Sequence, residues 1–119
     1  MAFAGVDDKL VMALRIMEEN VERPLSLGKV AKLCGISRRQ LERLFATHLG
    51  TSPLRHYLQV RVEHARRLIE GTHMGLIDIA VACGFQSASH FSKCFKLVFG
   101  TSPSQCRLDV PAWIEPGLG

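Results

Sequence analysis

Apolar residues recur every three or four positions through most of the chain, in short segments separated by glycine, proline or a capping residue. That spacing places the apolar side chains on one face of an α-helix. We therefore expect helices over residues 7–22, 26–34, 37–49, 53–71, 75–83, 87–99 and 103–108. The pattern predicts an all-α fold.

Several of these helices carry clear start and stop signals. Ser37 is followed three residues later by Gln40, which is the spacing of a capping box at the start of a helix. Gly35, just before it, suits the positive φ with which many helices end. Arg23 precedes Pro24 and is therefore disfavoured in the α conformation, so we expect the first helix to stop there. The signals predict a short helix, a tight turn at Gly35 and a second helix.

Each longer helix has a stripe of apolar residues that we expect to be buried. The stripes comprise Leu10, Leu14, Met17 and Val21; Leu41, Leu44, Phe45 and Leu49; Leu54, Tyr57, Leu58, Val62, Ala65, Leu68 and Ile69; and Phe91, Phe95, Val98 and Phe99. In the helix 37–49, the residues pointing farthest from the stripe are Arg39, Arg43 and Ala46, taking about 100° per residue. This helix therefore presents basic side chains outward.

The block that contains this helix occurs twice. Ala31-x-x-Cys34-Gly35 matches Ala80-x-x-Cys83-Gly84, and Gly50-Thr51-Ser52-Pro53 matches Gly100-Thr101-Ser102-Pro103. We expect one domain over residues 1–119, with a first helix-turn-helix subdomain at 7–50, a connecting helix at 51–71 and a second subdomain at 74–108. The tail at 109–119 is expected to be irregular, with Trp113 folding back onto the domain.

Composition narrows the class of protein. The 119 residues are 47% hydrophobic and 22% charged, as in ordinary globular proteins. No apolar run approaches the roughly 20 residues that cross a bilayer, and the N-terminus lacks the pattern of a secretory signal. We expect a cytoplasmic protein with no membrane partner. The four cysteines, Cys34, Cys83, Cys94 and Cys106, form no CxxC pair and are predicted to be reduced and buried.

Two helix-turn-helix units in a basic chain, with a net charge of +4, favour a DNA partner. The second helix of such a unit lies in the major groove, and successive major grooves on one face of B-DNA are about 34 Å apart. A connecting helix of roughly 18 residues spans about 27 Å, long enough for two units to occupy adjacent grooves. Arg39 and Arg43 are candidates to bind guanine, and Glu42 to accept from cytosine. The matching positions in the second unit are Ser89 and Lys93, flanked by Ser92 and Lys96, with His90 at the margin.

The motifs also resemble a known family. LxxVAxxCGISRRQLERLF, GTSPLRHYLQVRVEHARRLI and IDIAVACGFQSASHFSKCFKLVFGTSP are similar to the AraC/XylS family of bacterial transcription regulators, over residues 7–108. The subgroup it most resembles carries an N-terminal amidase-like sensor domain. The resemblance implies seven helices, homeodomain-like, that bind promoter DNA and activate or repress transcription. It leaves open a contact with RNA polymerase, and it implies a sensor or dimerisation domain elsewhere in a full-length protein.

Mapped by motif, the resemblance places base contacts on particular residues. They fall on Arg39, Glu42 and Arg43 in the first unit and on Ala88, Ser89, His90, Ser92 and Lys93 in the second. Ala88 has no side-chain donor, so a role there would be contact with a thymine methyl group. Candidates for the DNA backbone are Arg38, Lys96 and the helix starts Thr51, Ser52, Thr101 and Ser102.

Plainer interpretations remain open for several of these residues. Arg38, Arg39 and Arg43 are also consistent with an ordinary solvated helix face, as most charge clusters are. Glu42 has the i,i+4 spacing of an ion-pair partner for Arg38. His90 is equally consistent with a surface or capping histidine, and the serines and threonines with simple helix caps. On the connecting helix, Arg61, Arg66 and Arg67 are expected to be structural or to face phosphates, and Arg61 is a candidate partner for Asp78.

Other functional classes find less support. Cys34 and Cys83 recur as possible nucleophiles, but both face inward at helix ends, so we expect neither an enzyme nor a cofactor or metal site. The main alternative is a helical protein-protein docking module without specific DNA recognition. Salt separates the two, because DNA binding weakens steeply and log-linearly with salt and a mainly apolar docking surface does not.

Overall fold

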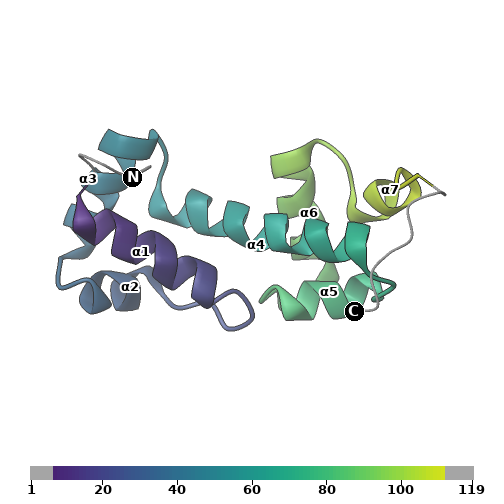
Figure 1. The fold of residues 1–119 in the computed structure, drawn as a ribbon, viewed down its shortest axis with the longest axis horizontal. Coiled ribbons are helices and arrows are strands. Elements are labelled where there is room, and N and C mark those ends of the chain that lie inside the picture. Colours follow the sequence, from purple (N-terminus) through teal and green to yellow (C-terminus); the bar gives the residue numbers. More distant parts are fainter. Residues whose placement is uncertain (1–6, 112–119) are drawn as a thin grey trace. The chain divides into compact units, whose positions relative to one another are not determined.

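The chain folds as the all-α pattern predicts. A computed structural model describes residues 7–111, and within that range it contains seven α-helices and no strand (Figure 1). The helices are α1 (Asp8–Glu19), α2 (Leu27–Leu33), α3 (Arg38–Leu49), α4 (Pro53–Gly71), α5 (Leu76–Ala82), α6 (Ala88–Phe99) and α7 (Pro103–Leu108). In the described part of the chain, no helix combines the length and the apolar character that a membrane span requires.

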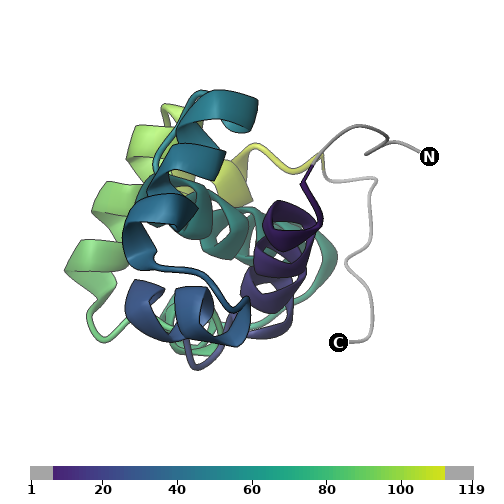
Figure 2. The same cartoon turned by 90° about the vertical axis from the view of Figure 1, so that its left-hand side faces the viewer.

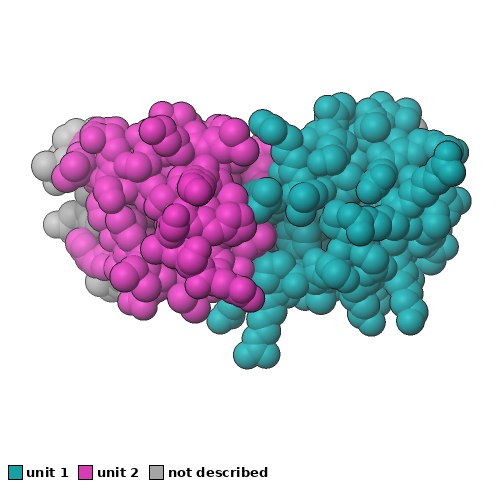
Figure 3. Space-filling model, turned by 180° about the vertical axis from the view of Figure 1, so that it is seen from behind, with its two compact units in different colours: residues 1–58 teal, residues 59–119 magenta. Residues whose placement is uncertain are grey.

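The chain divides into two compact units, residues 1–58 and 59–119, shown in separate colours in Figure 3. The division falls inside α4, so this helix begins in the first unit and ends in the second. The finer partition predicted from the sequence, with 51–71 as a segment of its own, stays a prediction.

In the first unit, α1, α2 and α3 pack together around one apolar core, and Figure 2 turns these helices toward the viewer. Leu10, Met17, Leu41 and Phe45 are completely buried there, and Tyr57 joins them from α4. Ser26 caps α2 by accepting a hydrogen bond from the backbone nitrogen of Lys29 at 3.1 Å.

The end of α1 differs from the prediction. The helix stops at Glu19 and not near residue 22, because Asn20 leaves the helical conformation, with φ −128° and ψ 59°. Its side-chain nitrogen donates to the carbonyl of Ile16 at 2.7 Å, and its own carbonyl accepts from the Tyr57 hydroxyl at 2.6 Å. Asn20 and Tyr57 therefore end α1 at Glu19, five residues before Pro24.

Both predicted turns contain a left-handed glycine. Gly35, between α2 and α3, has φ 72°, and Gly84, between α5 and α6, has φ 83°. L-residues with a side chain rarely adopt this conformation, so each glycine lets the chain reverse without strain. The two units thus connect their paired helices in the same way.

The second unit has its own core, built by α5, α6 and α7 with the later part of α4. Ile69, Ile79, Phe91 and Phe95 are almost completely buried. Phenylalanine rings form a continuous series through it, with centroid distances of 5.3 Å for Phe85–Phe91, 5.8 Å for Phe91–Phe95 and 4.8 Å for Phe95–Phe99. The core therefore extends along the buried face of α6.

Some burial predictions were wrong. Leu49 is 41% exposed and Leu54 is 58% exposed, whereas both were expected in buried stripes. They flank the turn between α3 and α4, at helix ends, where periodicity gives the direction of a side chain but not whether another element covers it. Val98 and Phe99 are only half-buried, at the end of α6. Residues 109–111 are irregular as predicted, and the prediction for Trp113 lies outside the described residues.

Candidate nucleic-acid interface

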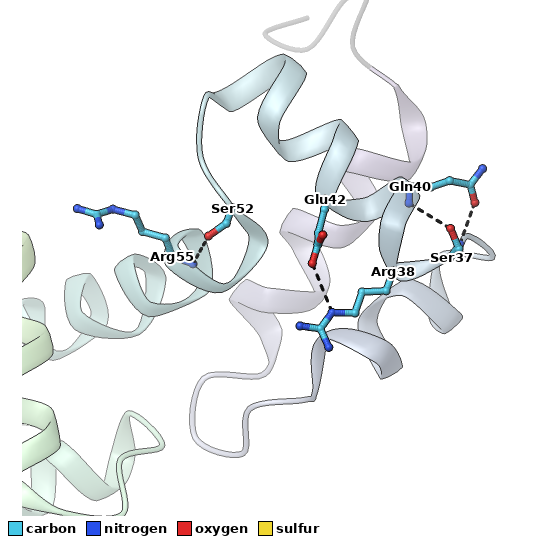
Figure 4. Close-up of polar contacts among 6 residues, drawn as sticks. All are labelled: Ser37, Arg38, Gln40, Glu42, Ser52 and Arg55. Atoms are coloured by element: carbon cyan, nitrogen blue, oxygen red, sulfur yellow. Dashed lines mark hydrogen bonds and ion pairs between the residues drawn. The ribbon is translucent and has the colours of Figure 1, made fainter.

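The first candidate recognition helix is α3, and its start is fixed by a capping box. The hydroxyl of Ser37 accepts from the backbone nitrogen of Gln40 at 3.1 Å, and the Gln40 side-chain oxygen accepts from the backbone nitrogen of Ser37 at 2.9 Å (Figure 4). Leu41 and Phe45 anchor the inner face of the helix in the core. The opposite face of α3 is therefore held rigidly toward solvent.

That outer face carries two arginines available for a ligand. Arg39 and Arg43 are both exposed and lie one helical turn apart. Within residues 7–111, neither side chain makes a hydrogen bond, an ion pair or a ring contact. Binding an anion or a guanine edge would therefore not require either arginine to give up a hydrogen bond or an ion pair with the described residues.

Glu42 and Arg38 instead contact each other. Arg38 Nε lies 3.5 Å from Glu42 Oε1, with the two side chains 62% and 54% exposed (Figure 4). The i,i+4 pairing considered from the sequence is thus confirmed. A base contact by Glu42 and a phosphate contact by Arg38 stay predictions, and each would compete with this weak surface pair.

The second candidate recognition helix, α6, also begins at a serine. The Ser87 hydroxyl accepts from the backbone nitrogen of His90 at 3.1 Å. The reciprocal bond of a capping box needs Glu or Gln at this third helical position, where α6 has histidine. Along the helix, Ala88, Ser89, Ser92, Lys93 and Lys96 are all exposed.

The imidazole of His90 is occupied within the protein. Its Nε2 lies 3.4 Å from Cys94 Sγ, and its ring meets the Phe85 ring edge-on at a centroid distance of 5.5 Å. The side chain does not cap the helix; only the backbone nitrogen takes part in the cap. A base contact by His90 stays a prediction, and it would have to compete with these two neighbours.

The serines proposed for the DNA backbone are helix caps. Ser52 accepts from the backbone nitrogen of Arg55 at 3.1 Å, which Figure 4 shows, and Ser102 accepts from that of Gln105 at 3.1 Å. The capping alternative is thus confirmed for both. Thr51 and Thr101 precede them at half-buried positions. Phosphate contacts by these four residues stay predictions.

Two arginines of α4 make contacts within the protein itself. Arg61 donates to the carbonyls of Cys83 at 2.9 Å and Gly84 at 2.7 Å. Arg66 pairs with Glu70 at 3.3 Å. The structural role is therefore observed for Arg61. For Arg66 and Arg67, the choice between a structural and a phosphate-facing role stays a prediction, as does the pairing of Arg61 with Asp78.

Two residues make structural hydrogen bonds that the sequence does not predict. Arg107 of α7 donates to the carbonyls of Met74, Ile69 and Thr72, and so ties α7 to the end of α4. Tyr57, expected only as a core residue, also accepts a hydrogen bond from the backbone nitrogen of Leu25 at 3.0 Å. Neither contact has a local sequence signal.

The cysteines are free thiols, as predicted, and all four are buried. Burial raises the pKa of Cys83 from its ordinary value of 9.0 to about 11, although Arg61 and Arg67 oppose the shift. Burial also raises the pKa of Cys34, against the opposing charge of Lys9. Both are therefore protonated at neutral pH and poor nucleophiles. No group of three potential metal ligands occurs among the described residues.

The amino-acid sequence is similar to those of known helix-turn-helix regulators. A family model described as a helix-turn-helix domain matches residues 30–109. The chain is 45% identical over 103 residues to the HTH-type transcriptional regulator GbdR of Pseudomonas aeruginosa, covering 87% of this chain and 28% of GbdR. It is 41% identical over 113 residues to the regulator CdhR of the same species, covering 92% of this chain and 34% of CdhR. The chain thus spans about a third or less of these relatives.

Solved structures show the same fold. A transcriptional regulator of Chromobacterium violaceum, described as containing an AraC-type DNA-binding domain, is 42% identical with a TM-score of 0.83, covering 88% of this chain and 94% of its own. The DNA-binding domain of the transcriptional factor AdpA, solved in complex with a target DNA, is 27% identical with a TM-score of 0.80. That alignment covers 86% of this chain and 92% of the AdpA domain.

Proposed function

The chain belongs to the AraC-type helix-turn-helix DNA-binding domains of transcriptional regulators, and on that premise we propose that it binds double-stranded promoter DNA at specific sequences. In this proposal α3 and α6 each enter a major groove, and the two grooves are adjacent. The site need not be palindromic, because the two recognition helices carry different side chains. The docking-module alternative is not favoured by the relatives.

The observation that carries the proposal is the outer face of α3. Arg39 and Arg43 are exposed, one turn apart and unpaired within the described residues, on a helix fixed by its capping box. An arginine can donate to O6 and N7 of one guanine, and each good bidentate contact discriminates against a wrong base by about 1–3 kcal/mol. We propose that these two residues supply most of the sequence recognition in the first unit.

We propose a weaker contribution from α6. Ser89 and Lys93 occupy the outward positions that correspond to Arg39 and Arg43. A serine hydroxyl and a lysine ammonium lack the planar, two-pronged donor geometry of arginine, so they specify a base less strictly. Lys93 and Lys96 add positive charge that attracts the phosphate backbone.

The relatives are longer than this chain, which bears on the rest of the proposal. The matched relatives are transcriptional regulators of which this chain covers about a third or less, so we propose that a sensor or dimerisation domain accompanies it in a longer protein. We also propose cytoplasmic action on bacterial promoters and a contact with RNA polymerase, through either activation or repression. We propose no catalytic role, because the raised pKa values of Cys34 and Cys83 make both thiols poor nucleophiles.

The proposal is tested by selecting bound sites from random double-stranded DNA and then measuring affinity against salt. We expect enrichment of one site and a linear fall of log K with log salt, with a slope near −0.9 for each phosphate contacted. The Arg39→Ala, Arg43→Ala double variant should lose most of the discrimination between the enriched and random sequences. Absence of any enriched site, together with salt-insensitive binding, would support the docking alternative.

A further inference from the structure

The turn between α5 and α6 is held by a side chain that does not belong to the helix-turn-helix itself. Arg61, from α4, donates through Nε to the Cys83 carbonyl at 2.9 Å and through Nη2 to the Gly84 carbonyl at 2.7 Å. Helices leave their last carbonyls without partners inside the helix. The planar guanidinium suits this task because it offers two donors in a fixed fork.

The same guanidinium also covers the next residue of the turn. Its Cζ lies 4.1 Å from the centroid of the Phe85 ring, within the range of a cation–π contact. Phe85 is only 4% exposed, and its ring contacts those of His90 and Phe91 at centroid distances of 5.5 and 5.3 Å. Arg61 therefore reaches the first turn of α6 through one intermediate side chain.

The first unit fixes its recognition helix by other means. Gln40 completes the capping box of α3, whereas His90 stands at the corresponding position of α6 and cannot close one in this way. Lys9 lies beside the first turn, with its Nζ 3.6 Å from the place a Cβ on Gly35 would take. Lys9 is exposed, and within residues 7–111 its ammonium makes no hydrogen bond.

We infer that Arg61 is a positioning residue for the second recognition helix. Arg61 sets the direction in which α6 leaves its turn, and that direction determines which bases Ser89 and Lys93 reach. This inference rests on the proposed DNA-binding function. An arginine on α4, which is not on the outer face of α6, would then influence base preference in one half of the site. The first half, bound by α3, does not depend on it.

The test uses two substitutions and a matched control. Arg61→Lys keeps the charge but loses the fork and the planar stacking, and Arg61→Gln keeps a donor but loses the charge. Arg66→Lys is the control, because Arg66 lies on the same helix, pairs with Glu70 at 3.3 Å and sits 4.9 Å from the Phe99 centroid. Arg66 thus shares the type of contact, but within the described residues it makes no hydrogen bond to the turn carbonyls that follow α5.

Base preference is measured by selection from random DNA, with the two halves of the site assigned through Arg43→Ala and Lys93→Ala. We expect Arg61→Lys to lower discrimination in the Lys93 half by about fivefold or more, the lower limit of one good base contact. The Arg43 half should keep its preference. Arg66→Lys should leave both halves unchanged.

A second measurement needs no DNA. Backbone amide chemical shifts should change at residues 87–91 in Arg61→Lys, remain unchanged at residues 8–49, and remain unchanged at 87–91 in Arg66→Lys. If the wild-type chain enriches no site, the proposed function fails, while these shifts still decide whether Arg61 positions α6.

Three results would overturn the inference. One is a folded Arg61→Lys variant with unchanged preference in the Lys93 half and unchanged shifts at 87–91. Another is an equal loss of preference in both halves, which would indicate a general effect on DNA binding. The third is outright unfolding of both Arg61 variants, which would assign Arg61 to stability alone.

Discussion

Some arginine side chains in this protein face solvent, and others bind backbone carbonyls. Arg39 and Arg43 point to solvent with no partner in the described part of the chain, while Arg61 and Arg107 donate to backbone carbonyls of other elements. The amino-acid sequence predicts the first kind, because an outward position on an amphipathic helix follows from periodicity alone. It does not predict the acceptors of the second kind, because Arg61 and its carbonyls are separated by 22 and 23 residues.

Arg43 provides the first prediction at the residue scale. Arg43→Ala should weaken binding to the selected site by about 1–3 kcal/mol and relax base choice at the position it contacts, because a bidentate contact to guanine is lost. Fluorescence anisotropy titrations at one fixed salt concentration measure both effects. Arg15→Ala, an exposed arginine on α1, is the control for removal of one positive charge. An equal loss on selected and random DNA would show that Arg43 contacts only phosphate.

Cys83 provides a prediction about pH. Its pKa rises from 9.0 to about 11 in the folded protein, so folding favours the protonated thiol. That contribution to stability is complete below pH 9 and is lost as pH rises through about 11. The free energy of unfolding should therefore fall between these pH values, and Cys83→Ala should make the fall shallower. Chemical denaturation at several pH values measures it.

A control separates the thiol from the space it fills. Val62→Ala also opens a cavity in the second unit, at a residue that is completely buried, but removes no titratable group. It should lower stability at every pH and keep the wild-type slope. A Cys83→Ala slope equal to that of Val62→Ala would contradict the assignment.

At the scale of elements, helix starts are well predicted and one helix end is not. Ser26, Ser37, Ser87 and Ser102 cap their helices through bonds to the backbone nitrogen three residues later, so the signal is local and visible in the sequence. The end of α1 depends instead on Tyr57, which lies 37 residues from Asn20. A contact across that distance depends on how the helices pack.

We therefore expect the Tyr57 hydroxyl to stabilise the first unit. Tyr57→Phe removes the hydroxyl that donates to Asn20 and accepts from Leu25, leaving both backbone groups without that partner. We expect a loss of stability of about 1 kcal/mol, at the lower end of the cost of an unsatisfied buried polar group, because Asn20 and Leu25 are half-buried. Denaturant unfolding measures the loss, and amide exchange should accelerate at residues 20–25.

Thr72→Val is the comparison for that experiment, since it removes a hydroxyl bonded to the Leu68 carbonyl in the second unit. It should leave exchange at residues 20–25 unchanged. Wild-type stability and wild-type exchange in Tyr57→Phe would mean that packing alone ends α1.

For the whole molecule, the repeat in the sequence is the strongest predictor of the fold. The matching Cys-Gly turns and Gly-Thr-Ser-Pro segments indicate two similar units, and the structure contains two units with separate cores. The likeness is incomplete at the recognition helices. Gln40 and His90 occupy the same capping position, and only Gln40 completes a capping box.

The prediction at this scale is the footprint. One chain should protect guanine N7 atoms in two adjacent major grooves, about 10 base pairs apart, because we propose that each recognition helix enters one groove. Methylation protection on the selected site measures this. Lys93→Ala should reduce the protection in one groove and leave that in the other intact. Protection confined to a single groove would rule out the paired arrangement.

The boundary inside α4 bears on how such a protein changes over generations. Each unit keeps its own core, so a substitution on the outer face of α6 leaves the packing of residues 1–58 untouched. New side chains can then arise by mutation in one unit while the other unit keeps its contacts with an existing promoter. Target sites can drift half by half, and a duplicated gene need not lose its first promoter before it acquires a second.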